Sequence, residues 1–252
     1  MIKASGDRLV TAAGQVTLGA IASSPVLLWT GLPWGAMHWV ALSAVIHLLY
    51  GLSLVAAYER GDLSAVYPIA RGTAPALVTI GAVVLLGDEV ATTGIIAVAL
   101  IVAGIVAIGM TGASHGTGWA VTTGLFITAY TLVDGHAVRG LDSALDYTAT
   151  LFLGNAILYV VMVIGVRGWE GVRRGVRENW WQQLLGGSAS VLAYTLVLIA
   201  ARIAPLGLVS AVRETSVIIG ALAGWLILRE PLGGRRLVAA GAIAAGLALV
   251  AL

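Results

Sequence analysis

Two arginines stand inside long apolar stretches of this 252-residue chain, where a fixed positive charge is unexpected. Arg71 lies in Y-P-I-A-R-G-T-A-P, within the stretch from Leu63 to Leu86, and Arg213 lies in A-V-R-E-T-S. A guanidinium group offers a planar fork of donors that suits a carboxylate or a phosphate. The two arginines therefore predict either an anion-binding site or side chains that reach from a helix to the nearby interface.

Acidic residues and a histidine within the apolar stretches are candidates for carrying protons. Asp134 lies in T-L-V-D-G-H-A-V-R, and His47 lies in A-V-I-H-L-L-Y. The alternatives are that Asp134 and His136 cap a helix end at the water interface, and that His47 is bonded to a backbone carbonyl. Glu214 follows Arg213 directly. Because neighbouring residues of a helix point about 100° apart, we expect Glu214 to need another partner or a proton.

Two further carboxylates stand where expected helices begin. Glu89 occurs in G-D-E and Glu230 in R-E-P, each just before an apolar stretch. A carboxylate at a helix N-terminus offsets the positive end of the helix dipole, and Pro231 suits a first helical turn. We expect Glu89 and Glu230 to act mainly in structure at these helix junctions.

The sequence lacks several common enzyme signatures. It contains no G-x-x-x-x-G-K-[ST], no H-E-x-x-H and no cysteine. These patterns would hold nucleotide phosphates, zinc or a nucleophile. We therefore expect no enzymatic activity, no cofactor and no metal site, and a gradient would have to supply the energy for any transport.

The composition predicts that these residues are carried by membrane-spanning helices. Hydrophobic residues make up 59% of the chain, charged residues 10%, and the mean hydropathy is +0.97. Each helical span needs roughly 20 apolar residues. The apolar stretches predict an all-α polytopic membrane protein with about nine transmembrane helices. They run at 8 to 29, 36 to 57, 63 to 86, 92 to 111, 118 to 137, 147 to 166, 181 to 201, 206 to 228 and 235 to 252.

The basic residues lie in the loops between these stretches rather than on one soluble face, which argues against nucleic acid as a partner. Alternate loops place ten Lys and Arg on one side and two, Arg139 and Arg202, on the other. Positive loops stay in the cytoplasm. We therefore expect a multi-pass protein of the plasma or inner membrane with a cytoplasmic N-terminus. The ten are Lys3, Arg8, Arg60, Arg167, Arg173, Arg174, Arg177, Arg229, Arg235 and Arg236.

A shift of 142 residues superposes the two halves of the sequence. It places Arg71 on Arg213, Arg60 on Arg202, and other pairs alike. The repeat unit contains five helices, and an odd number makes successive copies enter the membrane in opposite senses. We predict two inverted repeats, 1 to 112 and 113 to 252. The partner of the helix at 118 to 137 would fall before Met1, so the first repeat is expected to hold four helices and to lack its first.

Three segments together resemble a known transporter family. They are Y-P-I-A-R-G-T-A-P followed by G-D-E, then Y-T-L-V-D-G-H-A-V-R, and V-R-E-T-S-V-I-I-G-A-L-A-G-W-L-I-L-R-E-P-L-G. With them the chain resembles EamA-type members of the drug/metabolite transporter superfamily over essentially its whole length. The resemblance implies ten helices in two inverted five-helix repeats around a central cavity, and alternating access. It places Tyr67, Arg71, Asp134, Arg213 and Glu214 at that cavity, with Glu89 and Glu230 at helix junctions.

The combined interpretation is a gradient-driven or facilitative permease for a small metabolite. Arg71 and Arg213 would bind the anionic group of the solute, and His47, Asp134 or Glu214 would carry protons. The lipid bilayer and the solute are the expected partners. A homodimer formed through glycine and alanine faces is a further possibility. The alternatives are a multidrug exporter, for which an acidic site without paired arginines is expected, and a lipid-headgroup flippase or a non-transporting membrane subunit.

Overall fold

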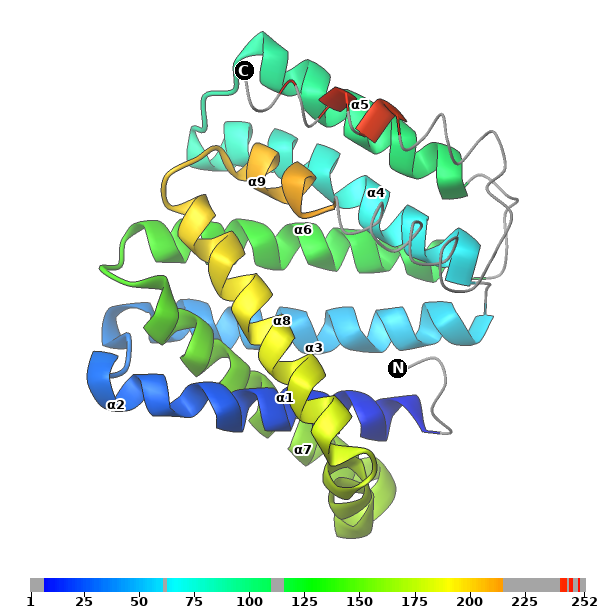
Figure 1. Cartoon of the computed structure of the whole chain (residues 1–252), viewed down its shortest axis with the longest axis vertical. Helices are drawn as coiled ribbons and strands as arrows, with labels where there is room; N and C mark the ends of the chain where they lie inside the picture. The colour runs from blue at the N-terminus through cyan, green and yellow to red at the C-terminus, as the bar shows by residue number, and fades with distance from the viewer. Residues whose placement is uncertain are drawn as a thin grey trace. The chain divides into compact units, whose positions relative to one another are not determined.

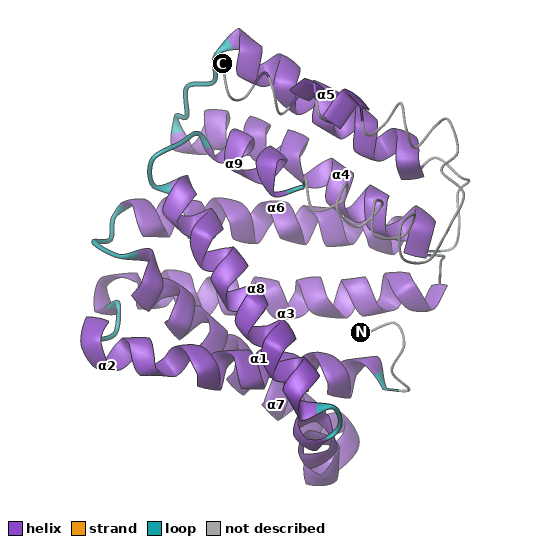
Figure 2. Cartoon of the chain, viewed as in Figure 1, coloured by secondary structure: helices purple, strands orange, loops and turns teal. Residues whose placement is uncertain are grey.

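The computed structural model describes residues 7–60, 63–109 and 116–214, together with 241–243, 245, 246 and 249. This part of the chain is helical, with short turns between the helices and no strand (Figure 2). The elements are α1 (Arg8–Ser23), η2 (Ser24–Val26), α2 (Leu27–Thr30), η3 (Trp34–Ala36), α3 (Met37–Arg60), α4 (Leu63–Gly81), η4 (Ala82–Leu86), α5 (Thr92–Gly109), α6 (Thr117–Arg139), α7 (Ala144–Arg177), α8 (Trp180–Ala201) and α9 (Leu206–Arg213).

Five helical stretches of the described chain are long and apolar enough to cross a membrane. They are Leu9–Thr30, Trp34–Arg60, Ile69–Leu86, Ala144–Arg177 and Trp180–Ala201, and Thr92–Val106 is a shorter apolar helix. The all-helical, multi-pass class predicted from composition is thus confirmed. The number of nine spans and the inverted repeat stay predictions, and much of the last two expected helices lies outside the described residues.

The helices form two compact units, and each unit is discontinuous in sequence (Figure 1). Unit 1 consists of Met1–Val55 and Val133–Ile203, and unit 2 of Ala56–Leu132 and Ala204–Leu252. The unit boundaries fall within α3 and within α6. Each unit therefore takes residues from both predicted repeats, 1 to 112 and 113 to 252.

Close helix packing in unit 1 depends on glycine. Helix α1 packs against α7 and α8. A Cβ atom added at Gly19 of α1 would lie 2.9 Å from the carbonyl oxygen of Gly187 in α8. Without side chains at these points the two backbones approach closely, as small residues allow in membrane helices. An apolar cluster that includes Val10, Tyr159 and Val163 continues the contact between α1 and α7.

Helix α7 extends beyond the expected span at 147 to 166, into the residues that were expected to form the loop before the span at 181 to 201. The backbone breaks at Gly168, with φ 69° and ψ 180°, and then resumes as a helix to Arg177. Glycine adopts this positive φ without steric penalty. Gly171 and Gly175 are buried after the break, whereas Arg173 is exposed, so the segment is amphipathic. The arginines of this segment lie on one face of the helix. In the linear sequence such a group of charged residues resembles a loop.

Unit 2 is built on α4, which packs against α5 and α9. The apolar contacts of this unit include a cluster of Val98, Ile101, Ile105, Ala211 and Ile243. Small side chains form the other contacts of α4: Ala70, for example, is buried with Ala57 and Ala120. The unit thereby brings α4 and the end of α9 together.

The two prolines of α4 do not interrupt the helix. Helix α4 is continuous from Leu63 to Gly81 through Pro68 and Pro75. The regular hydrogen-bond pattern changes only at η4, a π-helical turn that ends at Gly87 in the left-handed region, with φ 72°. One proline removes a single backbone donor, and surrounding packing can hold the helix around it.

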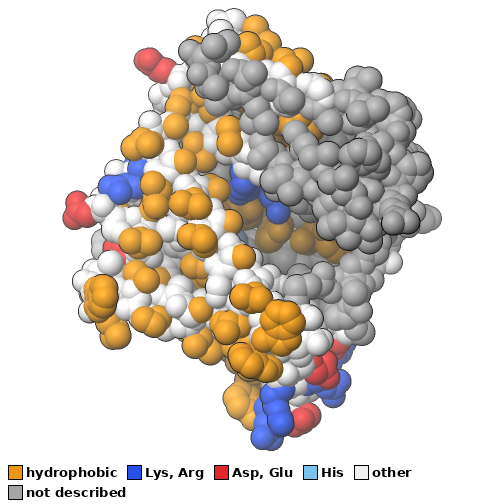
Figure 3. Space-filling view, in the orientation of Figure 1, with side chains coloured by type: hydrophobic (Ala, Val, Ile, Leu, Met, Phe, Trp, Pro, Cys, Tyr) orange, Lys and Arg blue, Asp and Glu red, His pale blue; other side chains and the backbone are white. Residues whose placement is uncertain are grey.

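Large apolar side chains are exposed throughout both units. Ile80, Val84 and Leu85 at the end of α4 and in η4 are examples. Figure 3 shows apolar side chains over most of the described part of one face, with charged side chains gathered at its lower end. A soluble protein rarely exposes so much apolar surface, whereas helices in contact with lipid must do so.

Candidate functional site

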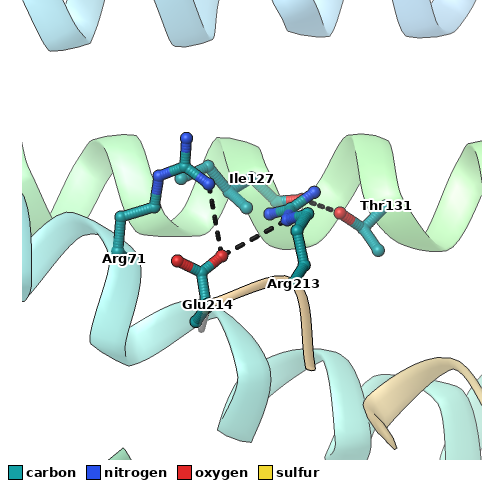
Figure 4. Close-up of polar contacts among 5 residues, drawn as sticks. All are labelled: Arg71, Ile127, Thr131, Arg213 and Glu214. Atoms are coloured by element: carbon teal, nitrogen blue, oxygen red, sulfur yellow. Dashed lines mark hydrogen bonds and ion pairs between the residues drawn. The ribbon is translucent and has the colours of Figure 1, made fainter. Parts of the chain in front are cut away.

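A buried cluster of three charged residues lies in unit 2. Arg71 Nη1 is 3.2 Å from Glu214 Oε1, and Arg213 Nε is 3.3 Å from the same oxygen. Figure 4 shows both arginine side chains pointing toward Glu214, Arg71 from α4 and Arg213 from α9. The Glu214 side chain is fully buried, and those of Arg71 and Arg213 are 25% and 14% exposed. The structure therefore brings together three of the residues predicted to form the site.

The surroundings of Arg71 argue against a side chain that only reaches the interface, whereas its role in anion binding stays a prediction. An arginine that merely reached the interface would have its guanidinium group in water, but Arg71 is mostly buried and is paired. Pro75 lacks the N–H group that would bond to the Arg71 carbonyl in a regular helix. Residues Gly72 and Ala74 beside Arg71 are small and buried, so the helix can place a long polar side chain among close neighbours.

The contact between Arg213 and Glu214 corrects an expectation from helical geometry. The two side chains were expected to point apart, but Arg213 Nε lies 3.3 Å from Glu214 Oε1. The expected further partner of Glu214 is present, since Arg71 Nη1 lies 3.2 Å from the same oxygen. Glu214 itself is the C-cap of α9.

Helix α9 is held at its other end by a carboxylate that the sequence interpretation missed. The Leu206 N–H group donates a 2.7 Å hydrogen bond to Asp88 Oδ2. An acceptor of this kind satisfies a backbone donor that has no partner within the helix. The neighbouring Glu89, which had been assigned to a helix junction, is exposed. Asp88 therefore caps α9, and the role expected for Glu89 at the start of α5 stays a prediction.

Two other predicted residues are outside what the structure describes. Glu230 lies beyond Glu214 in the part of the chain that is not described, and its junction role stays a prediction. Tyr67 belongs to α4, but its side chain is also outside the described part. Its place at a cavity therefore stays an implication of the family resemblance.

A second buried polar cluster lies in unit 1 around Asp134. The Tyr147 hydroxyl donates a 2.7 Å hydrogen bond to Asp134 Oδ1, and the Tyr194 hydroxyl donates to Oδ2. Asp134 is fully buried, so the interpretation that it caps a helix end at the water interface is wrong. Helix α6 continues past it to Arg139, which places Asp134 inside the helix.

His47 belongs to this cluster, whereas His136 does not. His47 Nδ1 lies 3.0 Å from the Ser43 carbonyl oxygen and 3.1 Å from the Ser43 hydroxyl. Its ring meets the ring of Tyr194 edge-on, with centroids 5.5 Å apart. The contact with the Ser43 carbonyl therefore agrees with the alternative that His47 is bonded to a backbone carbonyl. His136 is exposed and contacts Trp39 at 5.1 Å.

The two clusters offer different chemistry. Two guanidinium groups around one carboxylate leave an excess of positive charge, which favours an anionic ligand. A buried carboxylate with tyrosine and serine hydroxyl groups and an imidazole nearby is a set of groups that can hold and pass a proton. In the described ranges no three His, Asp or Glu side chains come together as a metal site. Tyr147, Tyr194 and Ser43 could not be found from the sequence, since no local pattern links them to Asp134.

Residues 115–252 match the family model of the EamA-like transporter family, which is more than half of the chain. The chain belongs to the EamA-like transporter family. Together with its apolar helices, this membership makes it a multi-pass membrane transporter of the drug/metabolite type. The resemblance stated from the three short sequence segments is thus confirmed at the level of the family.

Comparison with solved structures supports the fold of this EamA-like transporter. One crystal structure matches it with a TM-score of 0.79 and 16% sequence identity, over 100% of this chain and 91% of the other. At this identity the likeness concerns the fold alone. No curated protein sequence matches the chain.

Proposed function

We propose that this EamA-like transporter is a secondary permease that moves a small metabolite with an anionic group by alternating access. Arg71 and Arg213 bind the anionic group. The observation that carries the proposal is the buried cluster of two arginines and one glutamate in unit 2. A charged group inside a membrane protein is costly unless function retains it, and intramembrane ionisable residues usually mark a substrate or ion path.

The charge balance of the cluster argues for the class of solute. Two guanidinium groups converge on the single carboxylate of Glu214, and such a pair suits an anionic group. A carboxylate or phosphate matches the fork of a guanidinium group better than a halide does, because two oxygens can accept two parallel hydrogen bonds. A multidrug exporter for organic cations would instead favour a site dominated by carboxylates.

We further propose that Asp134 and His47 couple transport to protons. Both residues contact Tyr194 in unit 1: its hydroxyl donates to Asp134 Oδ2, and its ring meets the His47 ring edge-on. A carboxylate and an imidazole in one polar cluster can exchange a proton. The coupling would act in the inner or plasma membrane, with the N-terminus in the cytoplasm as the distribution of basic residues predicts.

A transport assay with chemically distinct solutes tests the proposal. The purified protein is reconstituted in liposomes, and counterflow is measured for small monocarboxylates, phosphate monoesters, zwitterionic amino acids and organic cations. We expect accumulation of anionic or zwitterionic solutes only. Transport confined to organic cations would favour a multidrug exporter. Movement of a labelled anionic phospholipid between leaflets, without transport of any soluble compound, would favour a flippase.

A further inference from the structure

The contacts of Glu214 are uneven between its two oxygens. Both arginines approach Oε1, Arg71 at 3.2 Å and Arg213 at 3.3 Å. Oε2 is buried and has no hydrogen-bond partner among the described residues. A carboxylate usually engages an arginine through both oxygens, and a buried oxygen without a partner lowers the stability of the arrangement. Glu214 therefore contacts both arginines through one oxygen and leaves its other oxygen without a hydrogen bond among the described residues.

The position of Glu214 on its helix is also unfavourable for a negative charge. It is the C-cap of α9, where the unpaired carbonyl groups give the helix end a partial negative charge. The same end favours the positive charge of Arg213. The attraction that holds the Glu214 carboxylate in place thus comes from the two arginines rather than from its own helix.

These features together point to a role for Glu214. We propose that Glu214 is a tethered competitor of the solute: its carboxylate occupies Arg71 and Arg213 when no solute is bound, and the anionic group of the solute displaces it. This inference rests on the proposed function and assigns the ligand of the site to small carboxylates or phosphates. A free anion has the advantage that both of its oxygens can pair with a guanidinium fork.

Competition from Glu214 would lower the affinity of the site for the anion and speed the release of the anion. An anion that must displace Glu214 binds more weakly than it would at two unoccupied arginines. Glu214 gives both arginines a carboxylate partner when no solute is bound, and it helps the solute to leave because Glu214 returns as the solute departs. Removing the charge of Glu214 should therefore tighten anion binding, whereas removing an arginine should weaken it.

Anion titrations of three variants test the role of Glu214. The purified full-length protein in lipid nanodiscs is titrated with acetate and with inorganic phosphate, and binding is followed by calorimetry. We expect Glu214→Gln to bind the preferred anion at least about tenfold more tightly than the unmodified protein, about 1.4 kcal/mol. Arg71→Met should lose most of the affinity. Glu89→Gln, an exposed carboxylate of the same unit, is the matched control and should bind as the unmodified protein does.

The outcomes separate this inference from the proposed function. If an anion binds to the unmodified protein in a manner that needs Arg71, but Glu214→Gln binds it no more tightly, Glu214 is not a competitor and only the inference fails. If no variant binds acetate or phosphate, the anionic cargo is wrong and both fail. Because Glu214→Gln could disturb folding, Glu214→Ala is measured as well, and a folded Glu214→Ala variant must also show tighter binding.

Discussion

Arg71 Nη1 lies 3.2 Å from Glu214 Oε1, although 143 residues separate the two in the chain. The contact joins the middle of α4 to the end of α9 within unit 2. It explains how an arginine can be carried by an otherwise apolar helix, since a buried charge needs a partner of opposite sign. The predictions below test this cluster, the elements that position it, and the second cluster around Asp134.

The cap of α9 should contribute measurably to stability. Asp88→Ala removes the acceptor of the Leu206 N–H group, and loss of such a cap costs about 0.5–2 kcal/mol. Glu89→Ala removes the neighbouring exposed carboxylate and should change the free energy of unfolding by less than about 0.5 kcal/mol. Thermal unfolding of both variants in one detergent measures the difference. Equal losses would show that Asp88 does not hold α9.

The cost of removing a hydrogen bond to Asp134 should depend on whether the Asp134 carboxyl group is present. Tyr147→Phe removes a 2.7 Å bond to a buried carboxylate and should destabilise the protein by about 1–3 kcal/mol. In an Asp134→Leu background the same change should have little effect, because the oxygen that the hydroxyl served is gone. Unfolding of the two single variants and the double variant forms a double-mutant cycle. Additive effects would mean that the phenol acts by packing alone.

The close approach of α1 and α8 predicts intolerance of one methyl group. Gly19→Ala would place a Cβ atom 2.9 Å from the Gly187 carbonyl oxygen, which forces the backbones apart at a cost of about 1–3 kcal/mol. Gly165→Ala in α7 is the control, since none of the described atoms lies within 4 Å of the added Cβ. We expect a lower midpoint of thermal unfolding for Gly19→Ala only. A similar midpoint for both would contradict the packing of these helices.

The link between Asp7 and Arg167 predicts a dependence of stability on pH. Partial burial tends to raise the pKa of Asp7, but the hydrogen bond and charge of Arg167, together with backbone N–H groups, outweigh it and lower this pKa. Arg167 Nε lies 2.8 Å from Asp7 Oδ2. The stabilisation is complete above the ordinary carboxyl pKa of 3.8 and is lost as the pH falls through the lowered value.

This dependence can be measured with Asp7→Asn, which keeps a cap for α1 but removes the charge. The difference in unfolding midpoint between the unmodified protein and the variant should be largest near pH 6 and should shrink toward about pH 3. Arg167→Met should weaken the dependence on pH, and the part that remains comes from the backbone N–H groups that bond to Asp7. A difference that stays constant over this range would show that the ion pair does not contribute.

The sequence predicted the helices well where lipid alone determines them. The limits expected for α3 and α5 fall within a few residues of Met37–Arg60 and Thr92–Gly109, because long apolar stretches have few alternatives in a membrane. The segment after Gly168 was missed because its arginines occupy one face of a helix, and a linear pattern of charges cannot distinguish that from a loop. In the structure the chain turns at Gly168, where φ is positive, and then continues as a helix to Arg177.

The site was predicted in part, and the limit has a physical reason. The repeat offset singled out Arg71 and Arg213, but the partner of both is Glu214, which a rule about helical neighbours had set apart. The rule did require a partner for Glu214 other than Arg213, and Arg71 is that partner. The burial of Asp134 could not be predicted, since it depends on Tyr147 and Tyr194 from two other helices. Local pattern gives the residue types, and tertiary packing decides which of them meet.

The central claim is that the two arginines of unit 2 bind the transported solute. Once the counterflow assay has identified a transported anion, its initial rate of uptake is measured for Arg71→Met, Arg213→Met and the exposed control Arg173→Met, each at matched protein density. We expect the first two variants to lose at least about 90% of the rate, about a tenfold change, and the control to keep it. Uptake that survives in both Arg71→Met and Arg213→Met would contradict the assignment of the site.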